Sequence, residues 1–214
     1  MRMVKSGTGT MALTAANTYT AETTVSAGTL APTGSGALSD SSTVNTSAAG
    51  AVFDLSGISA SSETIGALAG AASSSVVLGG KTLVAGASNA STSFAGAISG
   101  TGALTKTGTG TLDPFRRQRP HRRDHHLRRD DRATNSSAFS SGTVTLNGGT
   151  LNTSVNLSNP IVLNNTTNFI APNGAYRQLG GQITGFGGFC RSTAAAPPGL
   201  EFNNPANNFA GTSS

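Results

Sequence analysis

Two stretches of this chain share one signature: "VKSGTGTMALTAANTYTAETTVSAGTL" at residues 4–30 and "LTKTGTGTL" at residues 104–112. Both contain a lysine, then Ser or Thr, then Gly-Thr-Gly-Thr, starting at Lys5 and at Lys106. Self-similarity of this kind is typical of stacked units, each of which buries its apolar face only against its neighbours. The repeat therefore favours a solenoid.

Short alternating segments along the chain predict the strands of such a solenoid. In each segment every second residue is apolar, which gives a strand one buried face. The clearest segments are Thr10–Thr14, Ala51–Leu55, Thr143–Leu146 and Gly149–Asn152. Pairs of Gly or Asn separate them and predict tight turns, for example at Gly79-Gly80. We expect about ten residues from one strand to the next and no helix.

The composition agrees with thin β-coils. Charged residues make up 11% of the 214 residues and aromatic residues 5%, there is no Trp, and 28 residues are Gly. Gly costs about 1 kcal/mol per helical position relative to Ala, so long helices are disfavoured. Cys190 is the one cysteine, which excludes an internal disulfide. No apolar run has the length of a signal peptide or a membrane span.

The pattern L-T-K-T-G-x-G-T-L, followed by a segment like Ala16–Leu30, resembles the autotransporter-associated β-strand repeat of bacterial passenger domains. Residues 4–39 resemble a nearly complete copy, 98–112 the start of another, and 138–214 further coils of this kind. The resemblance implies a right-handed parallel β-helix, exported by a carboxy-terminal outer-membrane barrel that belongs to other parts of a longer protein.

We therefore predict an all-β chain, a fragment of a right-handed parallel β-helix with an irregular basic loop. Residues 1–112 are expected to form coils with autotransporter-type repeats, and residues 138–214 further coils. Residues 113–137 are expected to be a basic irregular segment that loops out of the stack, because buried arginines would lose several kcal/mol of hydration.

The basic segment begins with "DPFRRQRPHRRDHHLRRDDR" at residues 113–132, which holds eight Arg, four Asp and all three His of the chain. Six basic and five acidic residues remain outside it, so this segment carries +4 of the net charge of +5 and the rest of the chain is close to neutral. One interpretation is an arm that neutralises nucleic-acid phosphates, although the interleaved Asp residues weaken it. Another is a zinc site of His121, His125 and His126 with Asp124 or Asp130.

A third interpretation is a shift of reading frame. After "TGTGTL" the repeat pattern expects about nineteen residues like Ala12–Leu30, but the chain has the basic segment instead. Moved forward by one nucleotide, with suitable third bases, its codons permit "TLSGANALTGGTTISAGTT", which matches Ala12–Leu30 at ten of nineteen positions. We therefore hypothesise that residues 113 to about 132 are an out-of-frame copy of the repeat, with the frame restored near residues 133–137.

Other candidate sites are sparse. Glycoside hydrolysis needs two carboxylates about 5 to 9 Å apart, and the acids outside the basic segment are Glu22, Asp40, Asp54, Glu63 and Glu201. Cys190 has no histidine partner outside the basic segment for nucleophilic catalysis. The Asn-rich runs at 156–169 and 201–209 are expected to bond between successive coils, with a glycan-binding face as the alternative.

The sequence thus favours a non-catalytic structural stalk, or passenger segment, of a bacterial surface-exposed or secreted autotransporter-like protein. We expect no catalytic, cofactor-binding or metal-binding residues. The expected partners are neighbouring coils of a longer chain, with a glycan or host surface as a further candidate; no specific nucleic acid is expected. The alternatives are an adhesin segment that binds glycans or host surfaces, and an extracellular polysaccharide hydrolase or lyase of the β-helix type.

Overall fold

The fold was obtained as a computed structural model, which describes residues 1–113, 139, 141–153, 156–164, 168–172, 177–186, 189–190, 200–202 and 204–209. Within these residues the chain forms strands, bridges and turns and no helix. The prediction of an all-β chain is confirmed. The basic segment lies outside the described residues except for Asp113, so its predicted loop, its histidines and its arginines are not placed.

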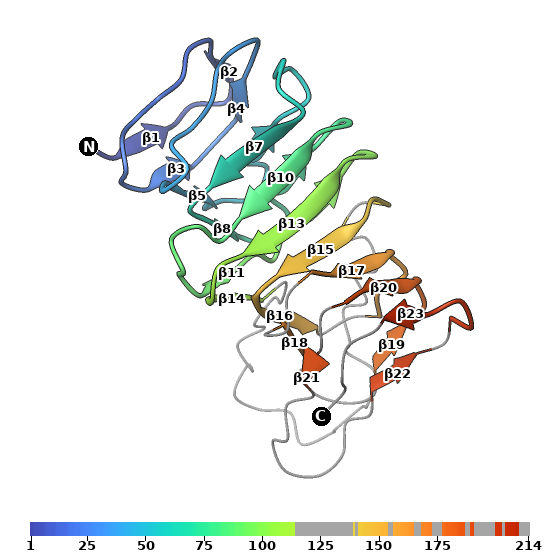
Figure 1. The fold of residues 1–214 in the computed structure, drawn as a ribbon. Helices are drawn as coiled ribbons and strands as arrows, with labels where there is room; N and C mark the ends of the chain where they lie inside the picture. The colour runs from blue at the N-terminus through green and yellow to red at the C-terminus, as the bar shows by residue number, and fades with distance from the viewer. Residues whose placement is uncertain are drawn as a thin grey trace, which may run out of the picture.

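All strand pairings between coils are parallel, and the strands stack into ladders along one axis (Figure 1). The first ladder contains β1 (Met3–Lys5), β3 (Thr23–Val25), β5 (Thr43–Thr46) and β8 (Ala67–Gly70). A bridge from Gly70 to Phe94 leads to the next ladder, of β11 (Thr92–Ser93), β14 (Thr111–Asp113), β16 (Gly149–Thr153), β18 (Asn168–Pro172) and β21 (Phe189–Cys190).

Two further faces complete the coils. One is the ladder of β2 (Thr10–Leu13), β4 (Thr29–Pro32), β6 (Val52–Asp54), β9 (Ser75–Val77) and β12 (Ala97–Ser99). The other is the ladder of β7 (Ser62–Ile65), β10 (Thr82–Ala85), β13 (Ala103–Thr107), β15 (Val144–Asn147), β17 (Ile161–Leu163), β20 (Ile183–Gly185) and β23 (Asn208–Phe209). Strands β19 (Arg177–Leu179) and β22 (Leu200–Phe202) form a separate pair. The predicted parallel β-solenoid is confirmed.

The core consists of columns in which equivalent inward residues of successive coils lie on one another. In the ladder that starts at β2, Met11 pairs with Leu30, Leu30 with Phe53, Phe53 with Val76, and Val76 with Ile98. Leu30, Phe53 and Val76 are fully buried, whereas Met11, at the end of the column, is 38% exposed. Each coil is therefore covered by the next one, and burial is a property of the stack.

Glycines fit where the backbones of successive coils approach most closely. Gly28 has φ of +64°, and a Cβ built there would lie 2.4 Å from the carbonyl oxygen of Gly9 in the preceding coil. A side chain at this corner would strain the backbone and push the coils apart. The glycine of the "AGTL" motif is thus required by stacking.

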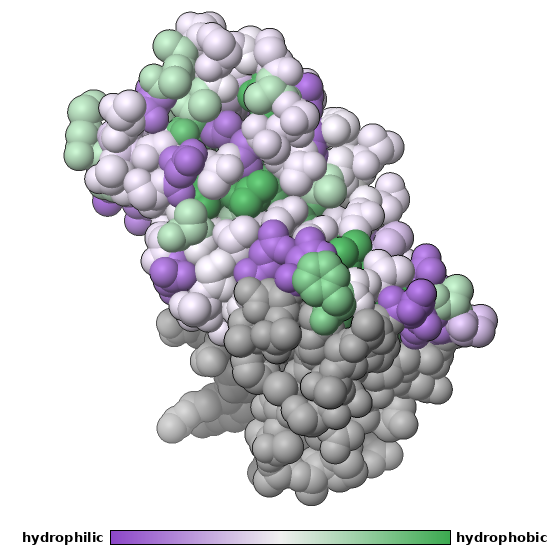
Figure 2. All heavy atoms as spheres, viewed as in Figure 1, coloured by the Kyte–Doolittle hydropathy of each residue, from purple (hydrophilic) through white to green (hydrophobic). Residues whose placement is uncertain are grey.

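The outside of the described coils carries Thr, Ser, Ala and Asn. Figure 2 shows a surface in which residues of intermediate hydropathy predominate, with small strongly hydrophilic areas between them. This agrees with the low content of charged residues, since polar but uncharged side chains alternate with the core residues along each strand. The described part of the chain has no helix with the length and hydrophobicity of a membrane span.

If stacking stabilises the fold, truncation in the middle of a column should cost more than truncation at its end. Leu30→Ala is expected to lower the free energy of unfolding by about 2–5 kcal/mol, because it leaves a cavity between two covering coils. Met11→Ala, in the same column but partly exposed, should cost much less. Urea unfolding followed by circular dichroism measures both values, and equal losses would contradict the stacking argument.

Candidate functional site

The carboxylates considered as a catalytic pair are used in contacts within and between coils. Glu22 Oε1 accepts hydrogen bonds from Thr24 Oγ1 at 3.2 Å and from Asn45 Nδ2, in the next coil, at 2.8 Å. Asp54 Oδ1 accepts a hydrogen bond from the backbone N–H of Ser56 at 2.9 Å, which holds a turn. Glu201 lies in β22, but its side chain is outside the described part.

Glu63 is the most unusual of these acids because it occupies an inward position. It pairs with Leu83, the next residue in its column, and it is only 4% exposed. Strand β7 begins its ladder, and Glu63 Oε1 accepts a hydrogen bond of 2.6 Å from the backbone N–H of Leu38 in the preceding coil. A buried N–H without an acceptor would cost about 1–3 kcal/mol, so the carboxyl group supplies the acceptor there.

The surroundings of Glu63 favour its neutral form. Burial raises the pKa of Glu63 to about 7, the hydrogen bond from Leu38 acts in the opposite direction, and the charge of Asp40 adds to the rise. Asp40 and Glu63 are thus electrostatically coupled, although the sequence placed Glu63 nearest to Asp54. Stacking has brought together acids from different coils, but Asp40 is exposed while Glu63 is buried.

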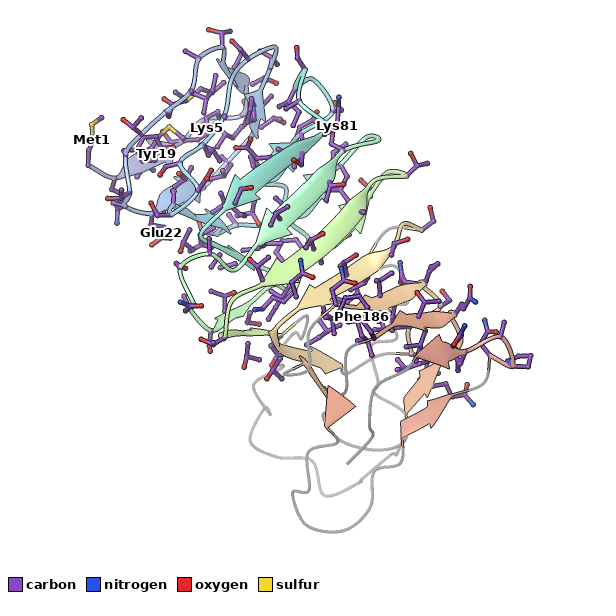
Figure 3. All side chains as sticks on the ribbon, viewed as in Figure 1. Met1, Lys5, Tyr19, Glu22, Lys81 and Phe186 are labelled. Atoms are coloured by element: carbon purple, nitrogen blue, oxygen red, sulfur yellow. The ribbon has the colours of Figure 1, made fainter. Side chains whose placement is uncertain are left out.

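A chain of hydroxyl groups continues this polar region through the first coils. Tyr19 Oη and Thr23 Oγ1 share a hydrogen bond of 2.8 Å, and Thr23 Oγ1 and Ser42 Oγ share one of 2.9 Å. Ser42 Oγ donates to the carbonyl oxygen of Ala21. Burial raises the pKa of Tyr19, the bond to Thr23 lowers it, and the charge of Glu63 raises it further. Figure 3 shows Tyr19 beside the first strands of the rod.

The lysine of the repeat is buried at a corner of the solenoid. Lys5 Nζ donates to the carbonyl oxygens of Gly7 at 2.7 Å and Ala27 at 3.0 Å, and Ala27 belongs to the next coil. Lys106, in the second copy, is 2% exposed and donates to the carbonyl oxygens of Thr107 and Gly108. Burial lowers the pKa of Lys106. Both ammonium groups therefore hold backbone carbonyls at the start of the Gly-Thr-Gly turn.

The sequence interpretation missed this role of the lysines. The repeat favoured a solenoid, but no role was predicted for the lysine that lies two residues before Gly-Thr-Gly-Thr. The available signal was that lysine is the one charged residue that both copies carry at the same position, in a chain with few charges. Glu63 gave no comparable signal, because an acid in an alternating segment reads as an outward residue.

Asparagine side chains join successive coils, as expected for the Asn-rich runs. The backbone N–H of Gln178 donates to Asn156 Oδ1 at 3.0 Å, and that of Ile183 donates to Asn207 Oδ1 at 2.8 Å. In each case the partner lies one coil away, and it is the backbone rather than a stacked amide. These bonds supply acceptors for backbone N–H groups of β19 and β20.

No metal site arises among the described residues, which contain no group of three or more His, Cys, Asp or Glu that could hold a metal ion. The proposed ligands His121, His125 and His126, with Asp124 and Asp130, lie outside the described part. Cys190 lies in β21, but its side chain is not described.

The buried lysine provides a first test of this geometry. Lys106→Met keeps most of the side-chain volume but leaves carbonyl oxygens at the corner without their donor. Because hydrogen bonds to charged groups contribute about 1.5–3 kcal/mol, the free energy of unfolding should fall by about that amount. Lys81→Met, at a partly exposed position, is the control and should change stability little.

Glu63 should make the stability depend on pH. Its folded pKa of about 7 lies above the ordinary value of 4.5, so its contribution is fully present below pH 4.5 and is lost as the pH rises through 7. The difference corresponds to about 3 kcal/mol. Glu63→Gln keeps an oxygen acceptor for Leu38 without ionising, so it should be more stable than the wild type at pH 8.5 and similar to it at pH 4. A wild-type stability that does not change over this range would contradict the assignment.

The chain was compared with protein-family models, with known proteins and with solved structures. A model of the family described as the passenger-associated-transport-repeat matches residues 3–31, which span β1 to β4 and include the buried Lys5. The "Adhesin BmaC autotransporter" of Brucella suis biovar 1 (strain 1330) is 37% identical over 148 residues. No solved structure matches the chain.

The match to this relative covers 69% of the present chain and 4% of the relative's length. The chain thus spans only a small part of the length of this relative. The matched repeat coincides with the first two coils of the solenoid, where the lysine corner and the close glycine contact lie. The chain carries the autotransporter passenger repeat that its sequence predicted, and it is a β-helical segment of the autotransporter passenger type.

Proposed function

We propose that this segment is a structural stalk within a passenger region at the bacterial cell surface or in the secreted fraction, and that it is non-catalytic. The observation that carries this proposal is the uninterrupted use of inward positions for stacking, from Leu30 to Ile98 on one face and from Leu83 to Ile183 on another. A rod built in this way holds other parts of a long protein away from the membrane.

The polar side chains support the same conclusion. Glu22, Glu63 and Lys5 each form a hydrogen bond to a neighbouring coil, so these ionisable side chains contribute to the contact between coils. Glu63 is 4% exposed, so it offers a sugar almost no surface. A polysaccharide hydrolase or lyase, the third candidate, would need two carboxylates that converge in an open groove, and release of reducing sugar from polysaccharides would identify it.

Neighbouring coils of a longer chain are the proposed partners. Met11 lies in a core column but is 38% exposed, because β2 is the first strand of its ladder in the described part and has a neighbouring strand on one side only. A further coil with an apolar residue in this position would cover Met11 as Leu30 is covered. The small share of the relative's length that this chain spans is compatible with such additional coils.

An adhesin segment is the second candidate, because the relative's name describes an adhesin. The outer Thr and Asn residues would then contact glycans or a host surface. Glycan-array binding by a variant that lacks residues 113–132 would support this candidate, since the arginines are removed and charge alone no longer explains binding. Absence of binding by this variant and by the full chain would favour the stalk.

The column that ends at the exposed Met11 predicts end-to-end association of the isolated chain, because exposed strand edges and apolar ends can pair with those of another molecule. Met11→Lys should lower this association by placing a charge on the end of the column. Val4→Lys introduces the same charge at a residue that is 47% exposed on an outward position of β1, and it should have a smaller effect. Light scattering over a range of concentrations gives the apparent mass; equal masses for both variants and the wild type would count against coil stacking at this end.

A further inference from the structure

The spacing between paired residues reveals an irregularity in the solenoid. In the described ladders, residues that pair across successive coils lie 17 to 24 positions apart in the sequence, which is the length of one coil. Two neighbouring contacts break this rule. Leu104 pairs with Val144, 40 positions later, and Thr111 pairs with Thr150, 39 positions later. Here the chain uses two coil lengths to advance by one coil.

A comparison of the two copies of the repeat gives the number of extra residues. In the first copy Lys5 pairs with Val25, 20 positions later, and in the second Lys106 pairs with Leu146, 40 positions later. The second copy is therefore longer by 40 − 20 = 20 residues. The basic stretch from 113 to 132 is also 20 residues long.

The close glycine contacts between successive coils are the same in the second copy, which has the extra residues, as in the first. A Cβ at Gly28 would meet the carbonyl oxygens of Gly9 and Gly7, at 2.4 and 2.6 Å. A Cβ at Gly149 would meet those of the equivalent Gly110 and Gly108, at 2.7 and 2.4 Å. The corner therefore closes in the second copy as it does in the first.

One of the three ladders that pass through the coils around β13 does not continue among the described strands. The ladders through β13 and β15 and through β14 and β16 continue, but among the described strands the ladder that starts at β2 ends at β12. Next to this end is an apolar hollow lined by Ile98, Leu104, Phe139 and Val144, among others. Phe139 is 3% exposed and fills part of the space beside the last strand of the ladder.

We infer that the solenoid closes over a sequence of one coil length between β14 and β15, so that this place is an insertion point of the rod. Each coil of a solenoid interacts only with its neighbours. Across this place the inward Leu104 pairs directly with the inward Val144, and both are buried. The coil that the sequence pattern expects after Leu112 is thus absent from the stack, while the ladders on two faces remain in register.

A pair of cysteines tests the register in the full-length chain, with Cys190→Ser as the background. Thr105→Cys with Thr145→Cys should form a disulfide, because the two residues pair in adjacent strands. Val84→Cys with Thr105→Cys is the matched control in an ordinary coil contact. Comparable cross-linking of both pairs is expected. Cross-linking of the control pair alone would show an intervening coil and overturn the inference.

A deletion gives a second, independent measurement. Removal of residues 114–133 should leave the thermal unfolding midpoint almost unchanged, because every strand of the described ladders is kept. Removal of residues 82–101, which is equally long but includes the buried Leu83, Phe94 and Ile98, should lower the midpoint clearly. If both deletions lower it equally, the basic segment belongs to the stack and the inference fails.

Discussion

Contact between equivalent residues of successive parallel coils is the interaction on which this structure depends. No single coil is thick enough to enclose an apolar side chain, as the exposed Met11 shows beside the fully buried Leu30 of the same column. Burial comes from repetition, so the core is a set of columns rather than a centre. This constraint explains the small side chains, the glycine corners and the alternation along every strand.

The same constraint explains why the few charges of the coils are found where they are. At the corners the strands end and their carbonyl groups lose ladder partners, and Lys5 and Lys106 supply donors there. At the start of a ladder an N–H lacks a strand to accept its bond, and Glu63 supplies an acceptor. Donor side chains at the corners and an acceptor side chain at the start of a ladder thus complete the backbone hydrogen bonding where the ladders are interrupted.

Much of this fold could be predicted from the sequence because its signals are local and periodic. Alternation gave the strands at Thr10–Leu13 and Gly149–Thr153, and the repeat gave their stacking. Glu63 and the lysine corners could not be predicted in the same way. Their roles depend on which backbone group of another coil lacks a partner, and that is set by register across about twenty residues rather than by neighbours in the sequence.

A fold in which each coil contacts only its neighbours can accommodate an insertion of about one coil length, which a globular core would not. In a globular core an extra twenty residues between two buried elements disturb contacts with several other elements at once. In the solenoid the two coils that flank the extra residues present the same inward pattern, Leu104 and Lys106 against Val144 and Leu146, and they can meet directly. This explains how an out-of-frame copy of the repeat, if the coding sequence contains one, remains compatible with an ordered rod.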